Sequence, residues 1–201
     1  MPIKVIGITG PTGAGKSLLC KEISHSIPVI DADEVYHSLL IPPSDCLNAL
    51  REAFGNSIFL ENGVLDRSAL SSIVFSGEEK LALLNQTVLD FVLTKIRAII
   101  AELEQAENTC VLVDAPTLIE SGFHLECNAV ISVLASPSLR LSRIMMRDSL
   151  SKETASLRIT AQKNDDFYRS HSDLVLINDG DITSLISQTV EFLTARGFLE
   201  A

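Results

Sequence analysis

The sequence predicts an α/β fold, a doubly wound sheet of about five parallel strands with helices on both faces. Short apolar runs rich in β-branched residues alternate with segments of helical periodicity, which is typical of strands buried on both faces of a parallel sheet. The predicted strands are Ile3–Thr9, Val29–Asp31, Cys110–Asp114, Val130–Ala135 and Leu174–Ile177. A chain of 201 residues, 46% of them hydrophobic, suffices for one such domain with a small insertion.

A phosphate-binding motif follows the first predicted strand. Gly10–Ser17 reads Gly-Pro-Thr-Gly-Ala-Gly-Lys-Ser and matches G-x-x-x-x-G-K-[ST] at every position, and a helical segment follows it. Glycines let successive N–H groups point at phosphate oxygens, and the helix N-terminus adds partial positive charge. Lys16 can reach the β- and γ-phosphates, and the Ser17 hydroxyl can ligate Mg²⁺. We therefore expect this P-loop to bind a nucleoside triphosphate.

Composition excludes several other classes of protein. The net charge of −10 argues against a nucleic-acid surface, and no apolar stretch is long enough to cross a bilayer. The P-loop lies so near Met1 that we expect no signal peptide, and hence a cytoplasmic protein. The cysteines lack metal-ligand spacing and are expected to be small buried hydrophobes: Cys20, Cys46, Cys110 and Cys127.

A long interval, Asp33–Thr109, separates the second and third predicted strands. It starts as a helix, breaks at Pro42-Pro43, and ends in a long helix from about Glu78 to Glu104. The interval is too long for a plain crossover and predicts an inserted helical subdomain. Later elements have clear starts, because Ser136 and Asp181 can each cap a following helix.

The P-loop indicates nucleotide binding but does not choose a reaction. A GTPase switch would need a guanine-reading N-K-x-D, and an ABC-type ATPase would need a serine- and glycine-rich signature; the sequence has neither. A small-molecule kinase needs an acceptor base, an acceptor site and a lid that carries arginines. The sequence offers a candidate for each of these three parts.

The candidate base lies at the end of the second predicted strand, in Asp31-Ala32-Asp33. The carboxyl ends of parallel strands face the ligand crevice beside the first βα loop. Asp33 lies past the strand end and can take a proton from an acceptor hydroxyl, while Asp31 holds the loop or a metal-bound water. The alternative is that Asp33 only caps the helix Glu34–Leu40.

The candidate lid is Arg140–Arg169, two helical stretches separated at Ser149–Ser151. Such a helix–loop–helix with arginines on its inner side can close over a phosphoryl group. The alternative is a solvated basic face, which the acidity of the rest of the chain disfavours. The segment holds seven of the 16 basic residues, namely Arg140, Arg143, Arg147, Lys152, Arg158, Lys163 and Arg169.

An ordered set of segments, spanning Ile3 to about Phe192, resembles the dephospho-coenzyme A kinase family. The segments are Gly10–Ser17, Asp31–Asp33, Phe54-Gly55, Gly63–Leu70, Asp114–Glu120, Arg143–Asp148, Arg158–Gln162 and Ser172–Gly180. The resemblance implies transfer of the γ-phosphoryl group of ATP, with Mg²⁺, to the 3′-hydroxyl of dephospho-CoA. It also implies a nucleotide-binding core (about 1–32, 105–140 and 170–201), an acceptor-binding subdomain (about 33–104) and a lid (about 141–169).

The resemblance also assigns residues by position. Asp33 matches the catalytic aspartate, Lys16 the phosphate-binding lysine, and Arg147 a lid arginine that stabilises the transferred group. The nucleotide is expected at Gly13, Ala14, Gly15, Lys16, Ser17, Leu18, Arg143, Asn178 and Gly180. The acceptor is expected at Asp31, Asp33, Asp114, Pro116, Leu118 and Arg158.

The chain departs from the family pattern at some positions. Gly10-Pro11-Thr12 replaces a usual Gly-Gly-apolar start of the loop, and Pro11 has no N–H to offer a phosphate. Leu89-Asp90 stands where the family usually has His-Pro, which bears on acceptor contacts and not on phosphoryl transfer. The alternatives to this function are another nucleoside or nucleotide kinase, or a nucleotide-sensing module without catalysis.

Overall fold

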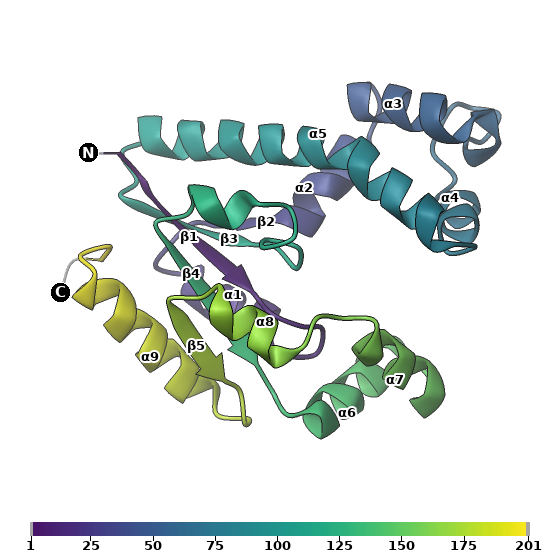
Figure 1. The fold of residues 1–201 in the computed structure, drawn as a ribbon. Helices are drawn as coiled ribbons and strands as arrows, with labels where there is room; N and C mark the ends of the chain where they lie inside the picture. Colours follow the sequence, from purple (N-terminus) through teal and green to yellow (C-terminus); the bar gives the residue numbers. More distant parts are fainter. Residues whose placement is uncertain (1, 200–201) are drawn as a thin grey trace. The chain divides into compact units, whose positions relative to one another are not determined.

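The computed structural model describes residues 2–199 and divides them into two compact units. One unit comprises the chain up to Asp31 and from Ile100 onward, and the other comprises Ala32–Ile99. The helix α5 (Glu78–Gln105) begins in the second unit and ends in the first. Figure 1 gives the order of the elements along the chain.

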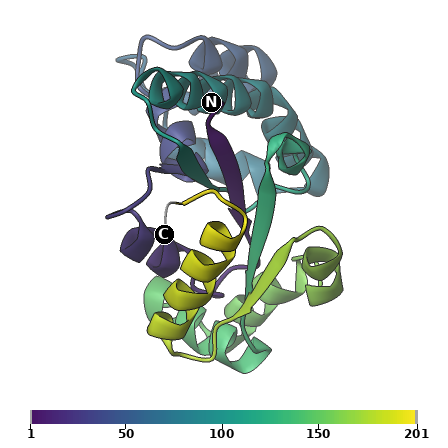
Figure 2. The ribbon, with the colours of Figure 1, turned by 90° about the vertical axis from the view of Figure 1, so that its left-hand side faces the viewer.

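The first unit is built on a five-stranded sheet with the order β2-β3-β1-β4-β5. Every pairing in the sheet is parallel, so the predicted α/β fold is confirmed. Figure 2 shows β1, β4 and β5 running side by side behind the helix α9 (Ile182–Ala195). The strands are β1 (Lys4–Thr9), β2 (Val29–Asp31), β3 (Cys110–Asp114), β4 (Ala129–Leu134) and β5 (Leu174–Ile177), each within one residue of its predicted bounds.

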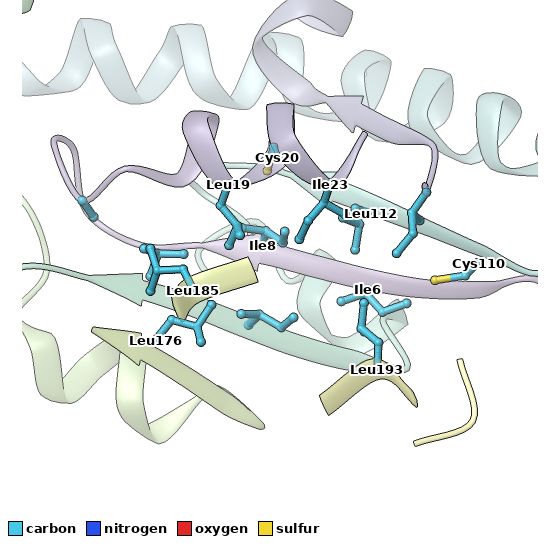
Figure 3. Packing of buried hydrophobic residues seen from close by; sticks show 14 residues of the cluster. Ile6, Ile8, Leu19, Cys20, Ile23, Cys110, Leu112, Leu176, Leu185 and Leu193 are labelled. Atoms are coloured by element: carbon cyan, nitrogen blue, oxygen red, sulfur yellow. The ribbon is translucent and has the colours of Figure 1, made fainter. Parts of the chain in front are cut away.

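Both faces of the sheet are covered, which explains why its strands are almost continuously apolar. Ile6 and Ile8 of β1 point to one face and pack with Leu19 of α1 (Lys16–Ile23) and Leu193 of α9 (Figure 3). Gly7, between them, faces the other side, where a Cβ would lie 2.4 Å from a methyl carbon of Leu118. This alternation divides each central strand between two apolar layers.

The remaining elements of the first unit begin where the sequence predicts caps. Ser136 accepts a hydrogen bond from the Leu139 N–H at the start of α6, and Asp181 accepts two at the start of α9. The elements are α1 (Lys16–Ile23), η2 (Phe123–Glu126), α6 (Pro137–Asp148), α7 (Lys152–Thr160), α8 (Asp165–Ser170) and α9 (Ile182–Ala195). Within residues 2–199, no helix is both long and apolar enough to cross a membrane.

The second unit is a small helical assembly with its own apolar core. Its elements are α2 (Ala32–Leu39), α3 (Asp45–Phe54), η1 (Asn56–Ile58), α4 (Arg67–Val74) and most of α5. Leu50 and Ile58 are fully buried in that core, and Leu84 and Val88 of α5 pack against it. The predicted break at Pro42-Pro43 and the predicted long helix are both confirmed.

Candidate active site

The P-loop connects β1 to α1 and can be formed only with glycines at its tightest points. Gly13 has φ +75° and Gly15 has φ +102°, in the left-handed region that side chains rarely adopt. A Cβ on Gly13 would lie 2.9 Å from the Arg140 carbonyl oxygen, and one on Gly15 would lie 2.1 Å from the Asn178 amide nitrogen. The loop is therefore packed tightly from behind, by α6 and by the turn after β5.

The carbonyl oxygens of the P-loop are held by side chains from outside the loop. Arg143 donates to the carbonyls of Gly13 and Ala14 at 3.2 and 3.3 Å, and Asn178 donates to Ala14 at 2.7 Å. Asn178 also accepts from Arg143 at 3.2 Å, which closes the network. Because a peptide's C=O and N–H point in opposite directions, holding these carbonyls fixes the directions of the N–H groups that follow them.

The start of α1 completes the anion site. Gly15 precedes the helix and offers no side chain to cap it, and Lys16 and Ser17 are its first residues. The Lys16 ammonium donates to the Gly10 carbonyl at 2.8 Å, so it folds back across the loop. Leu18, predicted to contact the nucleotide, is half-exposed on the next position of the helix.

Two predicted aspartates meet at the carboxyl edge of the sheet. Asp31 ends β2 and Asp114 ends β3, and the two are paired in register, with Ile8 of β1 beside Asp114. Asp114 is buried; burial of the Cys20 thiol on α1, with a further contribution from Asp114, raises the pKa of that thiol far above its ordinary value. The structure thus brings two carboxylates to the edge from which the P-loop departs.

The other predicted acceptor residues lie in different surroundings. Asp33 is in the first turn of α2 and belongs to the second unit, whereas Asp31 belongs to the sheet. Pro116 accepts a hydrogen bond from the Thr9 hydroxyl at 3.3 Å, which ties the segment after β3 to the end of β1. Leu118, also predicted to contact the acceptor, has a fully buried side chain that packs against Gly7.

The predicted lid carries a three-residue ionic cluster. Asp148, at the end of α6, accepts two hydrogen bonds from Arg147 at 2.7 and 3.0 Å and one from Arg158 of α7 at 2.6 Å. Hydrogen bonding and charge from Arg147, with a smaller contribution from Arg158, lower the pKa of Asp148. Both arginines remain more than half exposed, at 61% and 51% of their side chains, so other anions have access to them.

The sequence did not predict which side chains hold the backbone of the P-loop in place. Gly180, predicted to contact the nucleotide, donates its N–H to the Asn178 side chain at 3.2 Å. Arg140 and Gln162 also contact the P-loop, and neither was assigned to it from the sequence. A usable signal was the spacing of Arg140 and Arg143, which puts both on one face of α6.

Comparison with known proteins agrees with this geometry. The sequence model of the dephospho-CoA kinase family matches residues 4–184. This chain belongs to the dephospho-CoA kinase family. A dephospho-CoA kinase of Streptococcus pyogenes serotype M1 is 35% identical over 185 residues, which cover 92% of this chain and 93% of that protein. One from Oryza sativa subsp. japonica is 34% identical over 90% of this chain and 79% of its own length.

The fold of this chain is also similar to that of solved structures. The crystal structure of TT1252 from Thermus thermophilus has a TM-score of 0.80 and 29% identity, and the match covers 98% of each chain. A shikimate kinase from Acinetobacter baumannii, only 16% identical, still has a TM-score of 0.53 over 96% of this chain. The dephospho-CoA kinase family therefore shares its α/β arrangement with kinases of other substrates.

Proposed function

We propose that this chain transfers the γ-phosphoryl group of ATP to the 3′-hydroxyl of dephospho-CoA, which yields ADP and coenzyme A. Membership of the family supports the substrate pair. The observation that carries the proposal is the P-loop whose carbonyls are held from outside by Arg143 and Asn178. That arrangement presents N–H groups and Lys16 to a polyphosphate.

The reaction is an in-line displacement at phosphorus. The 3′-oxygen of the acceptor forms a bond to the γ-phosphorus, and the bond from that phosphorus to the β–γ bridging oxygen breaks, which releases ADP. The hydroxyl proton passes to the Asp33 carboxylate, which we propose as the general base. Lys16 and Arg147 stabilise the negative charge on the phosphoryl oxygens during transfer.

The residues at the sheet edge suit a magnesium ion bound with the nucleotide. The Ser17 hydroxyl is a hard oxygen donor in the first turn of α1, and Asp31 and Asp114 are carboxylates on adjacent strand ends. We propose that Ser17 ligates the ion and that Asp31 holds one of its waters. When bound, Mg²⁺ neutralises charge on the β- and γ-phosphates.

The remaining predicted parts take the acceptor and close the site. We propose that the helical unit Ala32–Ile99, within the predicted 33–104, binds dephospho-CoA together with Asp114, Pro116 and Arg158. The predicted lid, 141–169, presents Arg147 to the transferred group. We propose a cytoplasmic location, and the net charge of −10 supports small-molecule partners over nucleic acid.

The deciding experiment measures ADP release with Mg²⁺–ATP and dephospho-CoA, beside a panel of nucleosides, nucleotides and shikimate. Phosphorylation of dephospho-CoA alone, with the phosphate located on the 3′-oxygen by ³¹P NMR, supports the proposal. Lys16→Ala is the control, since it removes the cation at the β- and γ-phosphates and should abolish turnover. Preference for another acceptor would mean a different small-molecule kinase, and ATP binding without any turnover would mean a nucleotide sensor.

A further inference from the structure

One residue of the P-loop, Thr12, is held at both of its backbone polar groups by residues distant in sequence. Its N–H donates to the side-chain oxygen of Gln162 at 3.0 Å, and its C=O accepts from Nε of Arg140 at 3.0 Å. Arg140 also donates from its terminal nitrogen to the same Gln162 oxygen at 2.9 Å. The three residues form a closed set of hydrogen bonds, which we call the Thr12 clamp.

The hydrogen bonds of the Thr12 clamp are partly buried. Arg140 is only 4% exposed, and burial lowers its pKa while Asp165 and Tyr168 act in the opposite direction. A buried guanidinium depends on its hydrogen bonds, because the charge has lost most of its hydration. One turn later on α6, Ile144 is fully buried and fixes the helix against the P-loop.

The Thr12 clamp lies at both stems of the predicted lid. Arg140 is on α6, the helix that leads into the lid. Gln162 follows the end of α7, where its N–H still bonds to the Ile159 carbonyl at 3.2 Å, and α8 begins three residues later at Asp165. Figure 1 shows α7 following α6 and preceding α8. The segment that carries Arg158 is therefore tied, at each end, to the same P-loop residue, Thr12.

The Thr12 clamp also determines which N–H groups can meet a phosphate. The Thr12 N–H is turned toward Gln162, and Pro11 has no N–H. Pro11 and Thr12 therefore donate no N–H to an anion. The backbone N–H groups that can bind a phosphate begin at Gly13. A P-loop in which the N–H at the position of Thr12 had no partner in the protein would have one more donor for a phosphate than this chain has.

We infer that Arg140 and Gln162 are positioning residues that fix the backbone of Thr12 and couple the P-loop to the lid. The inference rests on the proposed function in one respect, namely that the P-loop holds a triphosphate. Breaking the Thr12 clamp should loosen the loop and both lid stems together. Both residues act on the loop through the backbone of Thr12, so the effect should fall on nucleotide affinity more than on the chemical step.

The test compares three variants of the full chain, labelled with ¹⁵N and free of ligand. Gln162→Leu keeps the size of the side chain and removes its oxygen, whereas Gln162→Glu keeps an acceptor for both Arg140 and Thr12. Gln188→Leu is the matched control, because Gln188 lies exposed on α9 and bonds only within its own helix. The readouts are exchange of the Thr12 amide with solvent, exchange of α7 amides, and the Kd for ATP by calorimetry.

In Gln162→Leu, we expect Thr12 exchange to accelerate and the Kd for ATP to rise, each by about tenfold, as for loss of a charge-assisted hydrogen bond. The α7 amides should exchange faster too, and kcat should change less than KM for ATP. Gln162→Glu should restore most of the Thr12 protection, and Gln188→Leu should match the parent chain.

Two results would overturn the inference. One is Thr12 exchange and ATP affinity in Gln162→Leu equal to those of Gln188→Leu. The other is Gln162→Glu as impaired as Gln162→Leu, which would show that the volume of the side chain matters and the hydrogen bonds do not. Exchange in the ligand-free chain does not depend on any reaction, so a failure of the proposed function leaves this measurement intact.

Discussion

Asn178 donates a hydrogen bond of 2.7 Å to the carbonyl oxygen of Ala14, across 164 positions of sequence. Asn178 lies in the turn after β5, at the edge of the sheet, and is only 4% exposed. Its side-chain oxygen accepts from Arg143 and from the Gly180 N–H, each at 3.2 Å. A residue of the last strand–helix turn thus supports the P-loop from behind.

Asn178→Ala should destabilise the chain by about 1–3 kcal/mol, because it leaves buried polar groups with fewer partners. The measurement is urea unfolding followed by circular dichroism. Asp179→Ala, at the exposed neighbouring position, is the control and should change stability by less than about 0.5 kcal/mol. ATP affinity should weaken in Asn178→Ala as well. Equal stabilities for the two variants would show that Asn178 does not support the loop.

The sheet could be predicted almost residue by residue, for a physical reason. Strands covered on both faces must be apolar at successive positions, so each appears in the sequence as a short β-branched run such as Cys110–Asp114. The caps Ser136 and Asp181 are equally local, since a capping side chain bonds to residues two or three positions on. Local patterns of this kind are visible without any knowledge of tertiary structure.

The supports of the P-loop could not be predicted in the same way. Asn178, Arg140 and Gln162 meet the loop only because the sheet and α6 bring them there. Hydrogen bonds between residues more than a hundred positions apart leave no periodic pattern in a sequence. The burial of Leu118 is a further example, because nothing in its sequence neighbourhood indicates that its side chain packs against Gly7 of β1.

Asp33→Asn should lower turnover by about 10²-fold or more, as expected for loss of a general base. Folding and ATP binding should be retained, since the substitution removes only a charge in the first turn of α2. A negative charge in the first turn stabilises the helix through its dipole by about 0.3–1 kcal/mol, so we expect Asp33→Asn to lower the melting temperature slightly.

The assay compares kcat and thermal unfolding of Asp33→Asn with those of Glu34→Gln. Glu34 is also acidic and lies in the same first turn, so it matches the effect on the helix dipole. A loss of turnover in Asp33→Asn that is absent from Glu34→Gln supports the role of Asp33 as the general base. A lower melting temperature with turnover intact would assign Asp33 a structural role in α2 alone.

The cysteines should be dispensable for catalysis. Burial raises the pKa of Cys110 to about 11 and of Cys127 to about 12, so both thiols stay protonated at neutral pH. Replacing all four by Ala or Ser should preserve the reaction, apart from a packing cost at the buried positions. The native chain should also react slowly with iodoacetamide until it is unfolded, which mass spectrometry can follow. Rapid alkylation accompanied by loss of turnover would contradict this.

Arg147 is held at the end of α6 by Asp148 and remains largely exposed, so it is pre-oriented and accessible. A phosphoryl group in transfer spreads negative charge over its oxygens, and Lys16 supplies positive charge only from the P-loop side. Arg147→Ala should therefore lower kcat by about 10²- to 10³-fold while KM for either substrate changes far less. Arg147→Lys should restore little, because an ammonium cannot reproduce the planar fork of donors.

Arg169 offers the matched control, as an exposed arginine on α8 within the same basic segment. Arg169→Ala removes an equal charge and should leave kcat near that of the parent chain, which separates a specific contact from general electrostatic attraction. In the parent chain, amides of α7 should become more protected from hydrogen exchange when both substrates are bound. If Arg147→Ala raises KM and leaves kcat unchanged, Arg147 binds the ground state and does not stabilise the transferred group.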